Sequence, residues 1–321
     1  MIASFTKTLI VLVLALLIDL GLGEPPLRIH PTVLMSKFIG HGIGVVRGRS
    51  ARLQRIYGVG LALTTIAVFA GASYLILWVA KLFGEPVQIA CEVLLLKPTF
   101  SIRLMCRYAS KLAFAIKQND WSGARATLRY IVRRDPEELS ESQVISAGVE
   151  SVAESTVDGI TSPLFFYAIF GVPGAVAYRA INTLDSMVGY KDPQFINLGW
   201  FSAKLDSIAN WFPARVTAII TIISAALSGQ SGAGALRILL RDRNRTESWN
   251  AGWVLSSMAG AFEVKLAKPR SYVLGDRNQE LDANHILEAT RMLAMNTILF
   301  IIFVVLPIAL GVQLLNGIIG H

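Results

Sequence analysis

The sequence predicts an all-α, polytopic integral membrane protein with re-entrant or amphipathic helices and cytoplasmic helical loops. Of its 321 residues, 53% are hydrophobic and only 16% are charged, whereas soluble domains carry about a quarter charged residues. The apolar residues gather in runs that approach the length of a membrane-spanning helix. No segment shows the strict apolar–polar alternation of a half-buried strand. We therefore expect residues 1–321 to form a single membrane-embedded domain.

Three runs predict complete spans, at residues 6–22, 57–82 and 295–315. Each approaches the roughly 20 apolar residues that cross a bilayer. The first run could pass for a signal peptide, but no small-x-small cleavage site follows it. We interpret it as a retained membrane helix.

Three further apolar segments are ambiguous, at residues 86–100, 162–181 and 211–227. The second is interrupted by Gly171-Val172-Pro173-Gly174, and halves of about eight residues are too short to cross a core of about 30 Å. It predicts a helical hairpin that enters and leaves on one side. The segment 86–100 is predicted as partial or re-entrant, and 211–227 as either a span or a buried amphipathic helix.

Residues 101–134 predict an amphipathic helix, a turn at Asn119-Asp120, and a second helix over Ser122–Arg133. Apolar residues recur every three or four positions in the first helix, which places them on one stripe. The stripe is formed by Leu104, Tyr108, Leu112 and Ala115, and the basic residues Arg103, Arg107, Lys111 and Lys117 lie off it.

The formal net charge of +8 favours anionic lipid and anionic substrates over nucleic acid, because the basic residues adjoin apolar spans. Residues 23–55, 103–134 and 228–294 are all basic and favour the cytoplasm. The run 57–82 separates the first region from the second, so the number of crossings stays open. The first region contains one acidic residue, Glu24, and six basic ones: Arg28, Lys37, Arg47, Arg49, Arg52 and Arg55.

Several common sites are excluded by the sequence. Cys91 and Cys106 form no disulfide framework or CxxC pair, and the four histidines are too scattered for a zinc site. No GxxxxGK[ST] motif occurs, so any nucleotide site is unconventional.

An acidic face is the first candidate site. Glu150, Glu154 and Asp158 fall at i, i+4 and i+8, so on a helix their carboxylates share one face and repel one another. Between Arg134 and Arg179 the chain has no Lys or Arg. A hydrated Mg²⁺ carrying a nucleotide or phosphate, a distant arginine, or water can neutralise this face.

Further polar clusters lie in membrane-like sequence. Ionisable groups beside apolar helices usually line a cavity, although hydrogen bonds between helices are the alternative for any one residue. The clusters are Arg179, Asn182 and Asp185, then Lys204, Asp206, Asn210 and Arg215, and then Asn250, Trp253 and Lys265.

Nine short blocks follow one another along the chain: Asp19, Glu24-Pro25-Pro26, His30-Pro31, Arg134-Asp135, residues 149–159 (VESVAESTVDG), 182–190 (NTLDSMVGY), 210–215 (NWFPAR), 250–260 (NAGWVLSSMAG) and 272–275 (YVLG). In sequence and in order they resemble the adenosylcobinamide-phosphate synthases of cobalamin biosynthesis, the CbiB/CobD family. Two positions depart from the family pattern, because Ser155 stands where an Asn is expected and Glu24 where an Asp is expected.

The resemblance implies ATP-dependent amide formation at the cytoplasmic face of the membrane. The propionate carboxyl of adenosylcobyric acid would join the amine of aminopropanol phosphate or a related aminoalcohol, with release of ADP and phosphate. Acidic residues would bind Mg²⁺ (Glu150, Glu154, Asp158) or accept the ammonium proton (Asp185 or Asp206). Substrates and phosphates would contact Arg134, Asp135, Arg179, Asn182, Lys204, Asn210, Arg215, Asn250, Trp253 and Lys265, and Trp200, Trp211, Trp249 and Trp253 would line a mouth for the corrin ring.

Two other functions stay open. A transporter would use the polar clusters as a substrate path, without ATP turnover. A non-catalytic sensor or partner of corrinoid-pathway enzymes would share the fold alone. The choice of aminoalcohol, the role of each carboxylate and the assembly, whether homo-oligomer or complex with other pathway enzymes, are not fixed by the sequence.

Overall fold

The computed structural model describes residues 2–28, 30–45, 48–132, 134–190 and 192–319, with Arg47 and Arg133 among the residues outside this description. The chain divides into two compact units. Unit 1 comprises Met1–Ser101, Ser162–Ala209 and Ile302–His321, and unit 2 comprises Ile102–Thr161 and Asn210–Ile301. Each unit is made of segments distant in the sequence, and the single membrane-embedded domain stays a prediction.

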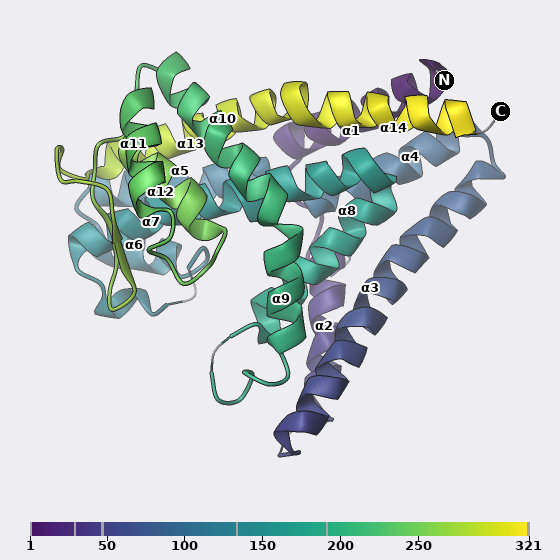
Figure 1. Cartoon of the computed structure of the whole chain (residues 1–321), viewed down its shortest axis with the longest axis horizontal. Coiled ribbons are helices and arrows are strands. Elements are labelled where there is room, and N and C mark those ends of the chain that lie inside the picture. Colours follow the sequence, from purple (N-terminus) through teal and green to yellow (C-terminus); the bar gives the residue numbers. More distant parts are fainter. Residues whose placement is uncertain (1, 29, 46–47, 133, 191, 320–321) are drawn as a thin grey trace. The chain divides into compact units, whose positions relative to one another are not determined.

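Unit 1 is entirely helical in its described part (Figure 1). Helices α2 and α9 both lie against the long helix α3, and α2 also packs against α8. The elements are α1 (Ile2–Gly21), α2 (Pro31–Gly44), α3 (Ala51–Lys81), α4 (Glu85–Leu96), the 3₁₀ turn η1 (Lys97–Thr99), α8 (Ser162–Val188), α9 (Trp200–Ala209) and α14 (Leu306–Ile319), with the π-turn η4 (Ile301–Val305) preceding α14.

Helix α8 folds back on itself at Gly171, whose φ of 66° and ψ of −160° are open to glycine but not to most residues. The rings of Phe166 and Tyr178 stack with their centroids 5.3 Å apart. Twelve residues of straight helix would separate them by about 18 Å. A side chain at Gly174 would overlap Phe170, so this glycine lets the two halves approach. The hairpin predicted from Gly171-Val172-Pro173-Gly174 is present, and its entry into a membrane stays a prediction.

Unit 2 joins helices to one small sheet (Figure 1). Helix α13 packs against α5, α7 and α10, and α12 packs against α10 and α11. The elements are α5 (Ile102–Lys117), α6 (Trp121–Leu128), the 3₁₀ turn η2 (Pro136–Glu138), α7 (Glu141–Thr156), the π-turn η3 (Val157–Thr161), α10 (Trp211–Leu227), α11 (Gly232–Asp242), α12 (Ala251–Ala261), β1 (Leu266–Lys268), β2 (Tyr272–Leu274) and α13 (Ala283–Phe300).

The amphipathic helix predicted after residue 101 is α5. Leu112 and Ala115 are buried, whereas Arg107 and Lys111 are exposed, so the periodicity identified the packed face. Next to it, a side chain at Gly148 of α7 would press on Leu112 and on Ile286 of α13. The missing side chain therefore allows α7 to pack closely between the two helices.

Two expectations for unit 2 were wrong in detail. The helix expected over Ser122–Arg133 is α6, which ends at Leu128. The β-branched residues Ile131 and Val132 that follow are poor helix formers, and Arg133 lies outside the described residues. The all-α fold class is confirmed, with one small exception where no strand was expected: β1 and β2 pair antiparallel, with Leu266 opposite Leu274. Strands of three residues are too short for alternation to reveal them.

The membrane character is confirmed by helix length and composition. Among the described residues, Ala51–Lys81, Glu141–Val188 and Ala283–Leu315 are long and apolar enough to cross a membrane, and α9 with α10 adds a fourth if counted as one span. The predicted spans 57–82 and 295–315 fall almost entirely within the first and third. Helix α1 covers all but the last residue of the segment 6–22, whose crossing of a membrane stays a prediction.

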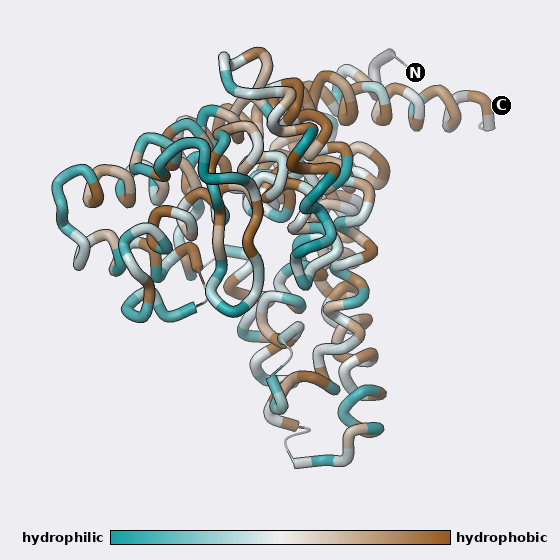
Figure 2. The backbone as a smooth tube through the Cα atoms, turned by 60° about the vertical axis from the view of Figure 1, so that its left-hand side comes forward, coloured by the Kyte–Doolittle hydropathy of each residue, from teal (hydrophilic) through white to brown (hydrophobic). Residues whose placement is uncertain are grey.

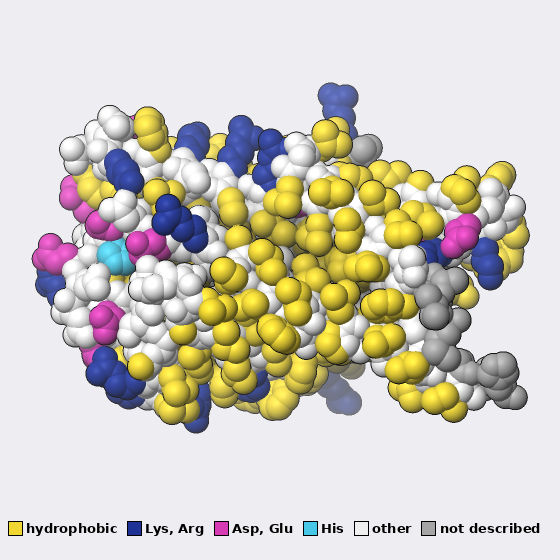
Figure 3. Space-filling model, turned by 90° about the horizontal axis from the view of Figure 1, so that it is seen from above, with side chains coloured by type: hydrophobic (Ala, Val, Ile, Leu, Met, Phe, Trp, Pro, Cys, Tyr) yellow, Lys and Arg dark blue, Asp and Glu magenta, His cyan; other side chains and the backbone are white. Residues whose placement is uncertain are grey.

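Apolar surface accompanies these helices. Hydrophobic stretches recur along the tube in Figure 2, and hydrophobic side chains cover much of the face in Figure 3. Helix α4 has 12 residues and would reach only about 18 Å, in agreement with the partial segment predicted over 86–100. Helix α10 has the predicted bounds, but Ile219 and Ile223 are exposed while Thr217 and Ala218 are buried, so both readings of it stay open.

Candidate functional site

The carboxylate of Glu150 is buried in unit 2 and fully engaged. It accepts hydrogen bonds from Arg134 Nη2 at 3.0 Å, from Tyr272 Oη at 3.0 Å and from Ser146 Oγ at 2.6 Å. Only 6% of the side chain is exposed. A buried charge needs a counter-charge and hydrogen bonds, and here Arg134 supplies the charge. Of the three alternatives predicted from the sequence, a distant arginine is therefore the one that neutralises the charge of Glu150.

Tyr272 ties the β-hairpin to α7 through this carboxylate. The backbone amide of Ala267, on the facing strand, also donates to Ser146 Oγ at 2.9 Å. Burial, followed by the negative charges of Glu150 and Glu154, raises the pKa of Tyr272 above its usual value. The phenol thus stays protonated near neutral pH and remains a donor to Glu150.

The three carboxylates predicted to bind Mg²⁺ are not assembled as one ligand set. Glu150 faces Arg134, Glu154 is exposed, and Asp158 is half-buried. The helix changes at Val157 into the π-turn η3, which adds a residue to the turn and shifts Asp158 out of the i+4 register. In the parts of the chain that are described, no three His, Cys, Asp or Glu side chains are grouped to hold a metal ion.

A second cluster in unit 2, the arginine–tryptophan cluster, consists of Trp211, Arg215, Arg243 and Trp253. The guanidinium of Arg215 lies 4.3 Å from the Trp211 ring centroid and 4.8 Å from that of Trp253, and Arg243 lies 5.2 Å from the Trp253 centroid. Arg215 Nη1 donates to Asn250 Oδ1 at 3.1 Å and to the Trp211 carbonyl at 2.6 Å. Three helices thus bring these groups together.

Glycines permit this arrangement. A side chain at Gly252 would overlap the Arg243 carbonyl, and side chains at Gly234 or Gly260 would overlap the facing backbone. Helices α11 and α12 therefore touch along their backbones, which sets Arg243 beside Trp253. Two glycines of the 250–260 block, Gly252 and Gly260, are thereby explained by packing.

The remaining predicted residues of unit 2 are dispersed. Asp135 is exposed, accepts from the Glu137 amide at 3.1 Å and lies 3.8 Å from Arg129, which makes it a local cap of η2. Lys265 is exposed, and Asn210 is buried at the start of α10.

In unit 1, Arg179 and Asn182 on the second half of α8 connect to α9. Arg179 donates through Nε, at 2.9 Å, and through Nη2 to the carbonyl of Thr99. Its Nη1 donates to Asn182 Oδ1 at 3.1 Å, and Asn182 Nδ2 donates to Asp206 Oδ1 at 3.4 Å. The predicted residues Arg179, Asn182 and Asp206 thus form one chain of hydrogen bonds. Asp185 is half-buried one turn further along α8, and Lys204 is exposed on α9.

Sequence reasoning missed a buried ionic cluster next to this chain, built around Lys97. Its Nζ lies 3.1 Å from Asp19 Oδ1 and 2.8 Å from Glu24 Oε2, with 4% of the side chain exposed. His30 Nε2 lies 3.1 Å from Glu24 Oε2. Burial raises the pKa of Glu24, but His30 and Lys97 outweigh it and hold that pKa below its usual value. The signal was a lysine inside the apolar run 86–100.

The predicted tryptophan mouth is divided between the units. Trp211 and Trp253 face Arg215 in unit 2, whereas Arg55 lies over the ring of Trp200 at 6.0 Å in unit 1. Trp249 is 66% exposed.

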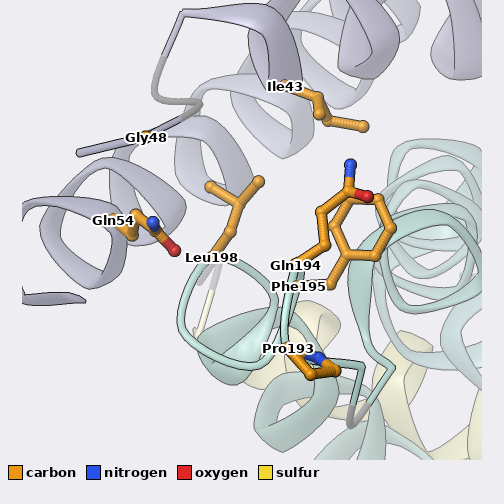
Figure 4. Close-up of a pocket in the computed structure, with 7 residues that line it drawn as sticks. All are labelled: Ile43, Gly48, Gln54, Pro193, Gln194, Phe195 and Leu198. Atoms are coloured by element: carbon orange, nitrogen blue, oxygen red, sulfur yellow. The ribbon is translucent and has the colours of Figure 1, made fainter. Parts of the chain in front are cut away.

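A small pocket opens in unit 1 between α2, the start of α3 and the loop after α8 (Figure 4). Gln194 and Phe195 extend from this loop toward Ile43. Its volume is about 110 Å³, which is room for several waters and too small for a macrocycle.

The structure combines apolar helices of bilayer length with ion pairs buried between its elements. These two features define the class of protein: an all-α membrane protein with buried polar clusters. The profile of the CobD/Cbib protein family matches residues 12–299. The chain therefore belongs to the CobD/CbiB family of cobalamin biosynthesis proteins.

Curated relatives agree along most of their length. The chain is 38% identical to the "Probable cobalamin biosynthesis protein CobD" of Methanothermobacter thermautotrophicus, over 90% of this chain and 94% of the relative. It is 38% identical to the "Cobalamin biosynthesis protein CobD" of Dehalococcoides mccartyi, over 84% and 87%, and 35% identical to the probable CobD of Thermoplasma volcanium, over 94% and 97%. No solved structure matches.

Proposed function

We propose that this protein is an ATP-dependent amide ligase, which joins the propionate carboxyl of adenosylcobyric acid to aminopropanol phosphate or a related aminoalcohol. The product is adenosylcobinamide phosphate. The carboxylate attacks the γ-phosphate of ATP and releases ADP, and the amine then displaces phosphate from the acyl phosphate. Each step moves charge between phosphates and carboxyl oxygens, so cationic and hydrogen-bonding groups are required.

The observation that carries the proposal is how family motif residues pair in space. In unit 2, Arg134 and Tyr272 both bind Glu150, and Arg215 binds Asn250. Partners 16, 122 and 35 residues apart belong to different blocks of the family pattern. Motifs that pair in this way supply a fixed frame for polar substrates, as a ligase needs.

Unit 1 offers the proton acceptor. Asp206 is half-buried and receives a hydrogen bond from Asn182. One oxygen is thus oriented by the amide, and a carboxylate held in this way can accept the ammonium proton that must leave before the amine attacks. Arg179 fixes Asn182 and acts in this account as a positioning residue. Asp185 is the other candidate base.

A protein-bound Mg²⁺ does not fit the described side chains, because Glu150 is neutralised by Arg134 and no three acidic or histidine side chains converge. Mg²⁺ enters here only as the counter-ion that accompanies ATP, and the exposed carboxylate of Glu154 is the one that we propose contacts it.

We also propose that the chain crosses the membrane several times, with the reaction on the cytoplasmic side. The basic regions 103–134 and 228–294 belong to the same compact unit, and basic loops favour the cytoplasm. Self-assembly, or association with other membrane enzymes of the pathway, would be compatible with the exposed apolar helices.

The test is ADP release by detergent-purified protein supplied with MgATP, adenosylcobyric acid and aminopropanol phosphate. We expect turnover that requires all three and that falls by about 10²-fold or more in Asp206→Asn, the scale of a lost general base. Glu280→Gln, at an exposed carboxylate of unit 2, is the matched control and should keep wild-type turnover. Glu154→Gln tests the acidic helix, because full activity in this variant excludes its carboxylate from ATP binding. Folded protein that binds the corrinoid but releases no ADP would favour a carrier or partner.

A further inference from the structure

The arginine–tryptophan cluster combines two arginines in contact with indole rings and one indole ring that is half-exposed to solvent. Trp211 is 52% exposed, and Arg215 and Arg243 are half-buried. Helices α10 and α12 carry Trp211, Arg215 and Trp253, and Arg243 directly follows α11. The three helices are neighbours in unit 2 (Figure 1). Packing of all three helices thus fixes the positions of these side chains.

Arg215 and Arg243 differ from the arginines around them in whether a carboxylate neutralises their charge. Arg237, Arg241 and Arg245 pair with Asp242 or Asp276. Hydrogen bonds from Arg241 and from the Gly275 amide hold the pKa of Asp242 below its usual value, despite the opposing effect of burial. This carboxylate is therefore committed to its neighbours.

Within the described residues, Arg215 and Arg243 form no ion pair with a carboxylate; their partners are indole rings, the Asn250 amide and a backbone carbonyl. Two guanidinium groups flanking Trp253 thus leave a local excess of positive charge. Stacking on an indole uses the face of a guanidinium and leaves N–H groups along its edge, which suit phosphate oxygens.

We propose that this cluster is the nucleotide site, with the phosphates of ATP against Arg215 and Arg243 and the adenine against the exposed ring of Trp211. The proposal rests on the ligase function, for which ATP is a substrate. It explains how a chain without a phosphate-binding loop motif holds ATP. The two guanidinium groups bind the phosphates in place of the loop, and the indole ring holds the adenine, as aromatic side chains stack bases in proteins that bind single-stranded nucleic acids.

A phospholipid headgroup shares the phosphate chemistry, and tryptophan and arginine are both common at membrane interfaces. The two ligands differ in one respect, because a headgroup carries no planar base. Contact with the base is therefore the part of the proposal that separates them.

The experiment is equilibrium dialysis of a non-hydrolysable ATP analogue against the full chain in a maltoside detergent, which carries no phosphate. We expect Arg215→Lys, which keeps the charge and loses the flat stack, to weaken binding about tenfold, or 1.4 kcal/mol. Trp211→Leu should weaken it at least about fivefold, as loss of a stacked base predicts, while Trp211→Phe keeps most of the affinity. Arg277→Gln, an exposed arginine of unit 2, is the control that leaves affinity unchanged.

Two further arms decide between ligands. Inorganic triphosphate should bind at least about fivefold more weakly than the analogue, and added phosphatidylglycerol should leave the analogue's affinity unchanged. Equal affinity of triphosphate and analogue, or displacement by phosphatidylglycerol, would overturn the nucleotide assignment in favour of a headgroup site. Equal affinity in all variants would place the nucleotide elsewhere. The dialysis contains no corrinoid or aminoalcohol, so it measures nucleotide binding alone. A protein that binds the analogue in this experiment but shows no turnover in the ADP-release assay would contradict the proposed reaction and not this nucleotide site.

Discussion

The Lys97 cluster of unit 1 and the arginine–tryptophan cluster of unit 2 both hold cations, but they neutralise them differently. Lys97 is surrounded by Asp19, Glu24 and, beyond Glu24, His30, so its charge is balanced inside the protein. Arg215 has aromatic and amide partners and is half-exposed. The first arrangement stabilises the fold at the turn that orients Arg179, whereas the second leaves charge for a ligand.

The largest expected effect concerns the balanced cluster. Lys97→Met should destabilise the protein by about 3–5 kcal/mol, because it leaves two carboxylates without their buried counter-charge. The double variant Lys97→Met/Asp19→Asn should recover part of this loss by removing one of those charges. Thermal unfolding in detergent, followed by circular dichroism, measures both. A single variant as stable as wild type would show that Lys97 is not the counter-charge.

The second prediction concerns Tyr272 and Glu150. Tyr272→Phe removes a hydrogen bond to a buried carboxylate and should cost about 1.5–3 kcal/mol, visible as a lower urea midpoint. Tyr130→Phe, at a ring that is 72% exposed, is the matched control, with a change below about 0.5 kcal/mol. Equal losses in the two variants would mean that the contact with Glu150 adds nothing.

The third prediction is a pH dependence. Since the folded pKa of Glu24 lies below its unfolded value, which is about 4.3, its ionic contacts stabilise the fold fully above that value. The contribution is lost as the pH falls from there through the folded pKa. The melting temperature of wild type should therefore fall more steeply below about pH 4.5 than that of Glu24→Gln. Parallel curves would contradict the assignment.

The smallest effect is expected at an exposed ion pair. Arg129 Nη2 lies 3.1 Å from Glu137 Oε1, and both side chains are about 60% exposed. Solvent screens such pairs, so Glu137→Gln should change stability by less than about 1 kcal/mol, and added salt should shrink even that difference. A loss of stability in Glu137→Gln as large as that in Lys97→Met would contradict the distinction between the buried ion pairs of Lys97 and this exposed ion pair.

Local patterns predicted the helices, because apolar runs and helical periodicity are properties of neighbouring residues. The long helix α3 and the bend at Gly171 follow from such patterns. The contact of Tyr272 with Glu150 does not, since it joins residues 122 positions apart and depends on how a short hairpin docks. Lys97 escaped notice because its apolar neighbours dominated the run, and the register of Asp158 was misjudged because a π-turn has no simple sequence signal.

The proposed ligation is tested most directly by the fate of the carboxyl oxygen. Adenosylcobyric acid labelled with ¹⁸O in its propionate carboxyl is incubated with MgATP, aminopropanol phosphate and the protein, and the released phosphate is analysed by mass spectrometry. Attack of the carboxylate on ATP predicts one ¹⁸O atom in the phosphate for each amide formed. Unlabelled phosphate released together with ADP would show hydrolysis by water and would contradict the account.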